Sequence, residues 1–394
     1  MLLNDTAVSI TQIAVMIGRG GNIVDYITLP YDKMITFCEE IFTSYGFTNE
    51  QSHVITDVLL RADLYGIESH GVQRLVRYDR EIGRGMVSIH AVPKVIHETP
   101  VSAVIDADRA MGQLSGVHGM QLAIKKAHKN GIGMIQVCNS NHFGIAGYYA
   151  KMAVEEDMIG ICMTNTEAIM LPTFGKQPML GTDPISLAMP ADPIPFLFDA
   201  ATTVVPRGKL EVYNKTERPL PDGWVLDEDG TGSNDPKRVL YNIIHRIGGG
   251  ILPLGGEGEL HSGYKGYGLA LICELCTGIL SGGPTANHIS SSGSYSGISH
   301  CFWAVDYGIF GGKKEIRSRF SDYLREIRNS PKATGEDRIF IHGEKELEEE
   351  QKKKKIGIPV NKKTFQEMQK IAKEQHVDIN DYFDASSITD IETI

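Results

Sequence analysis

The segment IESHGVQRLVRYDREIG, residues 67–83, combines side chains that together can bind and protonate an organic acid. We expect it to form a helix with Ser69 as its N-cap. His70, Arg74 and Tyr78 then follow at four-residue spacing, on one face of that helix. An imidazole can carry a proton near neutral pH, and a guanidinium can clamp a carboxylate near helix amides that favour anions. This face predicts a site for a small acid anion, with an ordinary solvated polar face as the alternative.

A second histidine lies in NSNHFGIAGYYA, residues 139–150, directly after the apolar run GIGMIQVC. A loop between a strand and a helix is where α/β proteins commonly bind ligands. The small residues Gly144, Ala146 and Gly147 permit close approach of a ligand or another backbone. Taken alone, His142 is compatible with either a structural or a catalytic role.

Three glycine-rich segments could bind phosphate groups: FGKQPMLGTDPISLAMP, FDAATTVVPRGK and LPLGGEGELHSGYKGYGLAL. Their backbone amides, with Lys176, Lys209 and Lys265, could form an anion site, whereas turn-rich connections with surface lysines are the alternative. Neither G-x-G-x-x-G after a strand nor G-x-x-x-x-G-K-[ST] occurs in the chain. A bound nucleotide would therefore not use the common phosphate loops.

The elements that must position these residues are predicted from periodicity. Residues 30–85 predict consecutive helices, the second with Thr48 and Gln51 in capping-box spacing. From about residue 99, the short β-branched runs SAVIDAD, GIGMIQVC, MIGICMT, ISLAMP and PFLFDAA alternate with helical stretches, which predicts an α/β protein with a mixed sheet. From about residue 311 the chain is helical again. We predict that LALICELCTGIL is a buried helix and that EKELEEEQKKKK is a solvated, salt-bridged helix face or linker.

Composition limits the class of protein. The 394 residues, 42% hydrophobic and 22% charged, are typical of a soluble globular protein larger than one ordinary core. The net charge of −10 disfavours binding to nucleic acid or an anionic membrane surface, and no apolar run is long enough to span a bilayer. We therefore expect neither nucleic acid nor a membrane as a partner. The opening residues lack the basic start of a signal peptide.

Six cysteines are too few for a disulfide scaffold and favour a reducing compartment, so we expect a cytoplasmic protein. Cys273 and Cys276 form a single C-x-x-C without a second pair, which gives no support for a zinc or redox site. No ligand spacing involves His70 or His142 either. We predict no metal.

The motifs ADLYGIESHGVQRL, NSNHFGIAGYYA, LGTDPISLAMP, FDAATTVVPRGK, PDGWVLDEDG and GYKGYGLAL occur in one order along the chain. In this order they resemble the malate/L-lactate dehydrogenase family of the type II, non-Rossmann kind. The resemblance covers about residues 30–345. Malate, sulfolactate, ureidoglycolate and lactate dehydrogenases belong to that family.

The resemblance implies an α/β fold with a non-Rossmann NAD(P)-binding domain, whose sheet is mixed and largely antiparallel, and a helical domain formed by both chain ends. It also implies a homodimer. The expected division is residues 1–27 as an extension of unknown use, 28–98 and 311–394 as the two parts of the helical domain, and 99–310 as the nucleotide-binding and sheet domain.

The implied activity is that of an NAD(P)-dependent oxidoreductase that interconverts a 2-hydroxy acid and a 2-oxo acid. We expect (S)-malate and oxaloacetate as substrates and NAD as the cofactor, with NADP possible. Sulfolactate, ureidoglycolate or lactate are alternative substrates. A non-catalytic nucleotide-binding homologue is the alternative from a different class, although retention of both histidines, Arg74 and Lys265 argues against it.

By position, His70 and His142 both match histidines assigned to the family's active site, and members differ in which one carries the proton. We expect His142 to be the general acid/base, with His70 orienting or sharing that role. Arg74, with Ser69 and Tyr78, would bind the substrate carboxylate. The segments implied to contact the cofactor contain Thr166, Asp199, Ala200, Ala201, Lys209, Tyr264, Lys265, Gly266, Gly343 and Glu344.

Two further points bear on the site. Asp183 in GTDP stands where many family members have asparagine. Malate and sulfolactate also carry a second anionic group, which requires a second cation near Arg74. Arg77 or a lysine from another loop could supply it.

Overall fold

The computed structural model describes residues 26–290, 295–383 and 389–390. Of the predicted extension, residues 1–27, only the last two fall within this range. Among the described residues, no helix combines the length and apolar character needed to cross a membrane.

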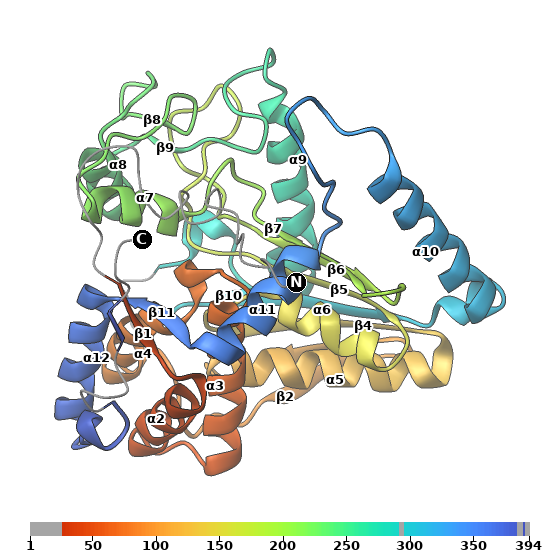
Figure 1. The fold of residues 1–394 in the computed structure, drawn as a ribbon, viewed down its shortest axis with the longest axis horizontal. Coiled ribbons are helices and arrows are strands. Elements are labelled where there is room, and N and C mark those ends of the chain that lie inside the picture. The colour runs from red at the N-terminus through yellow and green to blue at the C-terminus, as the bar shows by residue number, and fades with distance from the viewer. Residues whose placement is uncertain (1–25, 291–294, 384–388, 391–394) are drawn as a thin grey trace, which may run out of the picture.

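A seven-stranded sheet forms the centre of the molecule (Figure 1). Its strand order is β2-β3-β4-β10-β5-β6-β7, and every neighbouring pair except β3 and β4 is antiparallel, which confirms the predicted mixed, largely antiparallel sheet. The strands are β2 (Lys94–Glu98), β3 (Ser102–Asp106), β4 (Ile132–Ser140), β5 (Ile159–Thr164), β6 (Ile185–Met189), β7 (Phe196–Ala200) and β10 (Ile298–Val305). A second sheet contains β1 (Tyr26–Leu29), β11 (Ile358–Asn361) and β12 (Thr389–Asp390). A third sheet contains β8 (Val225–Leu226) and β9 (Gly250–Ile251).

Helices lie on both faces of this sheet. Helices α5 and α6 pack on one face, and α9 with the π-helical turn η3 (Leu275–Ile279) contacts the other. The helices are α2 (Tyr31–Ser44), α3 (Asn49–Leu64), α4 (Leu75–Gly83), α5 (Gly112–Asn130), α6 (Ala146–Glu155), α7 (Arg207–Lys215), α8 (Pro236–His245), α9 (Gly263–Glu274), α10 (Lys313–Asn329), α11 (Glu344–Ile356) and α12 (Lys362–Glu374). The predicted capping box of Thr48 and Gln51 is present at the start of α3.

Strand β10, which lies between β4 and β5, was not predicted. Its first residues are polar, and Ser299 and His300 interrupt the apolar pattern that marks a strand. Both are fully buried, and both are satisfied by hydrogen bonds: the Ser299 amide donates to Asn165 Oδ1 at 2.9 Å, and both His300 ring nitrogens are bonded. Side-chain hydrogen bonds thus allow a polar sequence to form a central strand.

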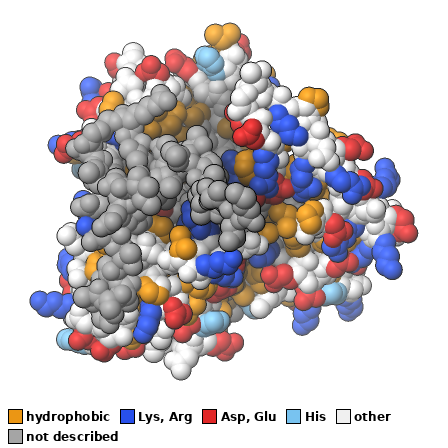
Figure 2. All heavy atoms as spheres, viewed as in Figure 1, with side chains coloured by type: hydrophobic (Ala, Val, Ile, Leu, Met, Phe, Trp, Pro, Cys, Tyr) orange, Lys and Arg blue, Asp and Glu red, His pale blue; other side chains and the backbone are white. Residues whose placement is uncertain are grey.

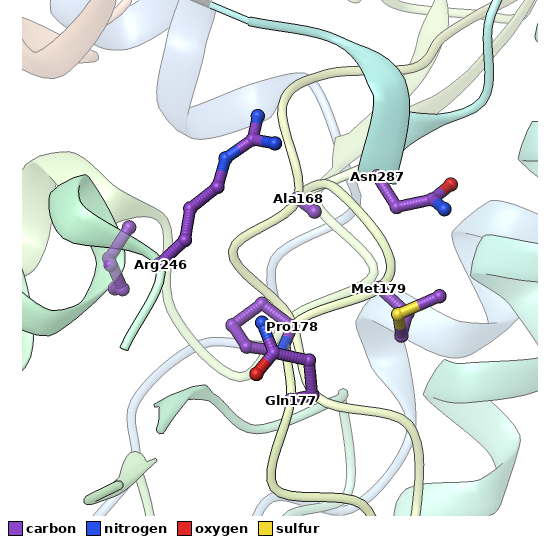
Figure 3. A pocket seen from close by; sticks show the side chains of 7 residues that line it. Ala168, Gln177, Pro178, Met179, Arg246 and Asn287 are labelled. Atoms are coloured by element: carbon purple, nitrogen blue, oxygen red, sulfur yellow. The ribbon is translucent and has the colours of Figure 1, made fainter. Parts of the chain in front are cut away.

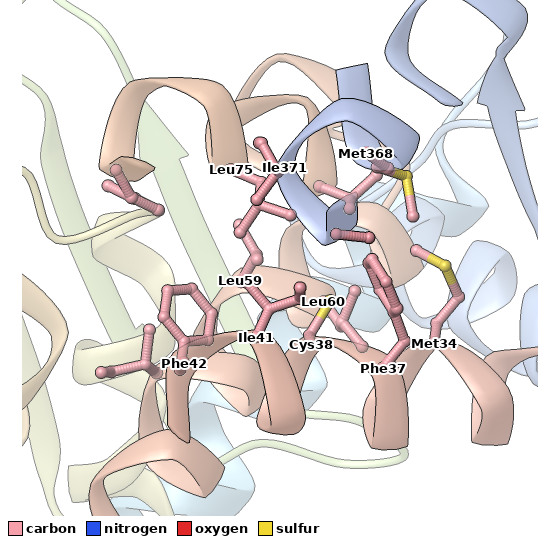
Figure 4. Close-up of a cluster of buried hydrophobic side chains, with 14 of the residues drawn as sticks. Met34, Phe37, Cys38, Ile41, Phe42, Leu59, Leu60, Leu75, Met368 and Ile371 are labelled. Atoms are coloured by element: carbon pink, nitrogen blue, oxygen red, sulfur yellow. The ribbon is translucent and has the colours of Figure 1, made fainter. Parts of the chain in front are cut away.

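The helices that carry the first motif share one core with the C-terminal part of the chain (Figure 4). Phe37 of α2, Leu59 of α3 and Leu75 of α4 pack in one cluster with Met368 and Ile371 of α12. Strand β1 pairs with β11, and Arg61 of α3 forms an ion pair with Glu350 of α11 at 2.6 Å. Contacts between the two ends of the chain therefore fix the position of α4.

Two helix predictions differ in outcome. The EKELEEEQKKKK segment forms α11, whose i,i+4 ion pairs confirm the predicted salt bridges. The segment is not wholly solvated as predicted, because Glu344, Glu350 and Lys353 are buried. Charges of both signs are interspersed on the face of the molecule shown in Figure 2. The LALICELCTGIL segment is not fully buried as predicted. Its cysteines are buried, but Leu271, Ile272 and Leu275 are about half exposed, because only one side of α9 and η3 packs on the sheet.

Candidate active site

The segment 67–83 does not form a single helix with Ser69 as its N-cap, as was predicted. Two 3-10 turns precede α4, and Arg74 occupies the N-cap position. Ser69 Oγ instead shares a hydrogen bond with Nδ1 of His70 at 2.9 Å. His70, Arg74 and Tyr78 are consequently not a stripe on one regular helix.

Asp63, at the end of α3, explains why the chain turns here. Its carboxylate is buried and accepts the backbone N–H of Val72 at 2.7 Å. A Cβ at residue 71 would lie 1.9 Å from Asp63 Oδ1, so only glycine fits at Gly71. Burial raises the pKa of the Asp63 carboxyl to about 7. This contact separates the two 3-10 turns and sets the direction from which His70 enters the site.

The two predicted catalytic histidines lie together. The rings of His70 and His142 are stacked with centroids 5.6 Å apart and an interplanar angle of 26°. Tyr78 Oη shares a hydrogen bond with His142 Nδ1 at 2.9 Å. With Nδ1 engaged, Nε2 of His142 is the ring atom left to exchange a proton with a ligand, and no hydrogen bond to it is found within the described part of the chain.

The loop that carries His142 is held tightly against the start of α5. The Asn141 amide group donates to the carbonyl oxygens of Arg109 and Ala110, both at 3.0 Å. A Cβ at Gly112 would lie 2.3 Å from the carbonyl oxygens of Asn141 and His142, so glycine permits this close approach. The imidazole is therefore positioned by rigid backbone contacts on both sides.

Electrostatics keep this group of side chains uncharged when no ligand is bound. Burial and then the positive charge of Arg77 lower the pKa of His142 well below its usual range. Burial and then Arg74 lower the pKa of His70 to about 3. Burial raises the pKa of the Tyr78 phenol. At neutral pH the site holds two neutral imidazoles and a protonated phenol beside two guanidinium groups.

Arg74 joins this site to α7. Its Nε donates to the carbonyl oxygen of Ser69 at 2.5 Å, and its guanidinium lies 3.5 Å from a carboxylate oxygen of Glu211. Glu211 also pairs with Arg207 at 3.1 Å. A Cβ at Gly208 would lie 2.6 Å from Ser69 Cβ, so the first turn of α7 packs directly on the site. The predicted cofactor residue Lys209 is exposed on this same turn.

A chain of hydrogen bonds brings the three predicted phosphate-binding segments side by side. Thr166 Oγ1 accepts the N–H of Thr182 at 3.0 Å, and the Thr182 carbonyl accepts that of Thr202 at 2.9 Å. The Thr202 carbonyl accepts from Leu254 at 2.8 Å, and the Leu254 carbonyl accepts from Gly266 at 3.2 Å. Ala200 and Ala201 directly precede Thr202. Most of the predicted cofactor residues thus lie in one contiguous loop cluster.

The start of α9 has the character of a phosphate site. Tyr264 and Lys265 lie in its first turn, where no side chain caps the helix amides. The Lys265 ammonium lies 5.9 Å from the centre of the half-exposed Tyr264 ring. The N–H groups of Gly263 and Gly266 donate to the carbonyl oxygens of Gly258 and Leu254, so the Lys265 ammonium and the positive end of the helix, rather than a row of free amides, would attract an anion. This charge is compatible with a phosphate group of a dinucleotide.

Three other predicted cofactor residues are engaged within the protein. Asp199 accepts the N–H of Gly147 at the start of α6 at 2.7 Å, and burial raises the pKa of its carboxyl to about 7. Glu344 is buried and forms ion pairs with Arg328 at 2.5 Å and Arg338 at 2.9 Å. Gly343 is the N-cap of α11 with φ of +101°. Their predicted contacts with a cofactor remain predictions.

Asp183 has a structural contact. It is fully buried, and its carboxylate accepts the N–H groups of Thr166 at 3.3 Å and Gly181 at 3.2 Å. Burial and the nearby carboxylate of Glu274 raise the pKa of Asp183 well above its usual range. Asp183 thus holds the loop that carries Thr166.

Two polar residues near the histidines were not predicted. His300 stacks on Phe143 with centroids 4.4 Å apart, and its ring nitrogens bond to Thr164 and Ser140. Gln113 of α5 is fully buried, and its amide group lies beside the Tyr78 phenol. Each falls within an apolar or small-residue run, so no local pattern marks it.

A pocket of about 220 Å³ lies apart from the histidines, between the loop after β5 and the end of α8 (Figure 3). Arg246, one of its lining residues, donates to the carbonyl of Ile289 at 2.6 Å and lies 3.6 Å from the Glu167 carboxylate. None of the predicted site residues lines it. Within the described residues, no three His, Cys, Asp or Glu side chains are grouped to hold a metal ion.

Comparison with known proteins places this geometry in a family. Residues 29–369 match the family model described as malate/L-lactate dehydrogenase. The chain is 44% identical to malate dehydrogenase of Pyrococcus abyssi over 350 residues, 89% of this chain and 95% of the relative. It is 36% identical to L-sulfolactate dehydrogenase of Methanocaldococcus jannaschii, over 88% of this chain and 96% of the relative.

A solved structure agrees with these matches. The structure of malate dehydrogenase from Pyrococcus horikoshii OT3 superposes with a TM-score of 0.82 at 42% identity, covering 90% of this chain and 97% of that one. The predicted resemblance is confirmed, as is the prediction of an enzyme. The chain belongs to the malate/L-lactate dehydrogenase family and is a hydroxy-acid dehydrogenase.

Proposed function

We propose that this enzyme interconverts (S)-malate and oxaloacetate with NAD(H), and that His142 carries the proton. The observation that carries the proposal is the hydrogen bond between Tyr78 Oη and His142 Nδ1, which leaves Nε2 to face the substrate oxygen. The malate dehydrogenases among its relatives, at up to 44% identity, support this choice of substrate.

Proton transfer follows from the neutral state of the imidazole. In the direction of malate oxidation, neutral His142 carries its own proton on Nδ1, which donates to Tyr78 Oη, and it accepts the hydroxyl proton at Nε2. Arg74 binds the carboxylate next to the reacting carbon and so fixes the hydroxyl against the ring. A nicotinamide cofactor supplies the hydride acceptor when it is bound. His70, stacked on His142, limits the orientations of the ring.

The loop cluster around Thr166, Ala200, Ala201 and Gly266, with the start of α9, is the proposed cofactor site. Lys265, at the positive end of α9, would bind the phosphates. Lys209, exposed on the first turn of α7, would supply a further cation. Gly343 and Glu344 are also proposed to contact the cofactor.

A panel assay tests substrate and cofactor together. The purified enzyme is supplied with NADH or NADPH and with oxaloacetate, sulfopyruvate, pyruvate or oxalurate, and oxidation of the nicotinamide is followed by absorbance. We expect the highest kcat/KM for oxaloacetate with NADH. If oxaloacetate ranks below sulfopyruvate, the relative named L-sulfolactate dehydrogenase becomes the better guide to the substrate. If NADPH supports faster turnover, NAD is the wrong cofactor.

We also propose a cytoplasmic homodimer that associates through α9 and η3. The outward faces of Leu271, Ile272, Leu275, Ile279 and Leu280 are each about half exposed and adjoin one another along this helix. An exposed apolar stripe of this length is typical of an interface between subunits. Light scattering of the wild type should give a molar mass twice that of one chain. Leu275→Glu should lower the measured mass toward that of the monomer. A wild-type monomer would exclude this interface.

A further inference from the structure

Arg77, the first arginine within α4, has a role that the proposed function does not assign. We propose that Arg77 binds the distal anionic group of a 2-oxo dicarboxylate while Arg74 binds the carboxylate beside the reacting carbon. This inference rests on the proposed function, since it specifies how the same site distinguishes a dicarboxylate from a monocarboxylate.

The position of Arg77 on the helix places it beside the reacting group. Arg77 lies three residues after Arg74, a spacing that makes two side chains neighbours at the start of α4. It directly precedes Tyr78, whose phenol is bonded to His142. Arg74 and Arg77 thus lie within one helical turn, and the positive charge of each lowers the pKa of both histidines.

The guanidinium of Arg77 has unused donors. Its Nε donates to Glu81 Oε1 at 2.7 Å, and this is its one hydrogen bond within the described residues. An arginine has five N–H donors, so both terminal amino groups remain available. The side chain is 26% exposed, which leaves it accessible to a ligand. A carboxylate or sulfonate could accept two parallel hydrogen bonds from it.

The charge of Arg77 is felt at the reacting imidazole. Among the charged groups that lower the pKa of His142, Arg77 comes first, ahead of His70 and Arg74, and no lysine is among them. This favours Arg77 over the alternative of a lysine from another loop. The nearest balancing charges are Glu81 and, more weakly, Glu167. An anion bound here would offset the excess positive charge around the histidines.

A purely structural ion pair is the competing explanation, because Glu81 is buried and needs a partner. Its second oxygen, Oε2, has no hydrogen-bond partner in the described structure. An arginine that served only to neutralise this carboxylate would be expected to engage both oxygens in a fork. The single contact through Nε instead orients the guanidinium and leaves its outer edge free.

The test is the ratio of kcat/KM for oxaloacetate to that for pyruvate, measured with NADH. We expect Arg77→Met to lower this ratio by about 10- to 100-fold, the effect of losing a charge-assisted hydrogen bond. Arg77→Lys, which keeps the positive charge, should lower the ratio less than Arg77→Met. Arg80→Met is the matched control, because Arg80 is an exposed arginine on the same helix, and it should leave the ratio unchanged. The sulfopyruvate-to-pyruvate ratio shows whether a distal sulfonate is bound in the same way.

The double variant Arg77→Met/Glu81→Gln guards against misfolding, since it removes the unpaired buried charge that the single variant would leave. The thermal unfolding of the double variant is compared with that of the wild type. We expect its ratio of kcat/KM for oxaloacetate to kcat/KM for pyruvate to fall as much as in Arg77→Met. Equal losses for oxaloacetate and pyruvate would make Arg77 structural and overturn the inference. If the wild-type enzyme reduces oxaloacetate and pyruvate with equal kcat/KM, only the inference about Arg77 is overturned. If it reduces neither acid, the proposed function is overturned as well.

Discussion

His142 and His300 are neighbouring buried imidazoles with opposite use of their ring nitrogens. Phe143, which follows His142 in the chain, stacks on His300. Both nitrogens of His300 are bonded to hydroxyl groups, Thr164 on one side and Ser140 on the other. His142 is bonded at Nδ1 only. Burial lowers the pKa of both rings, so burial does not distinguish a catalytic histidine from a structural one. The two histidines are distinguished by the ring nitrogen of His142 that has no hydrogen-bond partner among the described residues.

Replacing His142 should have the largest effect. We expect His142→Ala to lower kcat by about 100-fold or more, because it removes the group that accepts and returns the proton. Binding of NADH, followed by fluorescence, should persist. Turnover near that of the wild type would show that another group, with His70 the first candidate, carries the proton.

Tyr78→Phe should have an intermediate effect. The variant keeps the ring but removes the hydrogen bond that holds Nδ1 of His142, a contact worth about 1 kcal/mol. We expect kcat to fall by about 5- to 10-fold, with little change in the KM for the 2-oxo acid. A change confined to KM would mean that the phenol contacts the substrate rather than the imidazole.

His300→Phe should have the smallest effect on turnover, within about twofold, although it lies next to the site. It should instead lower the free energy of unfolding by about 1–3 kcal/mol, since the hydroxyl groups of Ser140 and Thr164 lose a partner. Urea unfolding at pH 7 measures this difference. A large loss of kcat in a stable variant would contradict the distinction between the two histidines.

The pH dependence of the same variant provides a further check. His300 has a pKa of about 3 in the folded protein and about 6.5 in an unfolded chain, so the unfolded state binds the extra proton in this range. The contribution of His300 to the free energy of unfolding therefore decreases by about 1.4 kcal/mol per pH unit as the pH falls from about 6.5 toward 3. The difference in unfolding free energy between wild type and His300→Phe should shrink below pH 6.5. A difference that stays constant with pH would mean that His300 titrates normally.

Much of the sheet was predictable, because β3 to β7 have apolar or β-branched runs bounded by turns. Strand β10 was not, since Ser299 and His300 are polar and become buried only through long-range partners. The single helix predicted over residues 67–83 was wrong for a similar reason. The buried carboxylate of Asp63 binds Val72 and imposes two tight turns, an interaction that helix periodicity does not contain.

At the site, the spacing of polar residues pointed to His70, Arg74 and Tyr78, and the family resemblance pointed to His142 as the proton carrier. The structure brings the two histidines and Tyr78 together. Spacing leaves Arg77 and a lysine as alternatives for the second cation, because that choice depends on which charge lies near the imidazole. Spacing also could not identify Gln113, whose burial follows from the packing of α5 against β4 and α3 rather than from its neighbours in sequence.

The pairing of β1 with β11 has a consequence for the order in which the enzyme is made. Strand β1 emerges from the ribosome long before its partner β11, because most of the described residues lie between them. Contacts between residues so distant in sequence slow folding, because a long loop must close before they form. The sheet core can assemble from neighbouring segments during synthesis, whereas the scaffold under His70 must wait for β11 and α12. The active site is therefore completed only after these two elements are synthesised, and a chain that ended before them would lack a finished site.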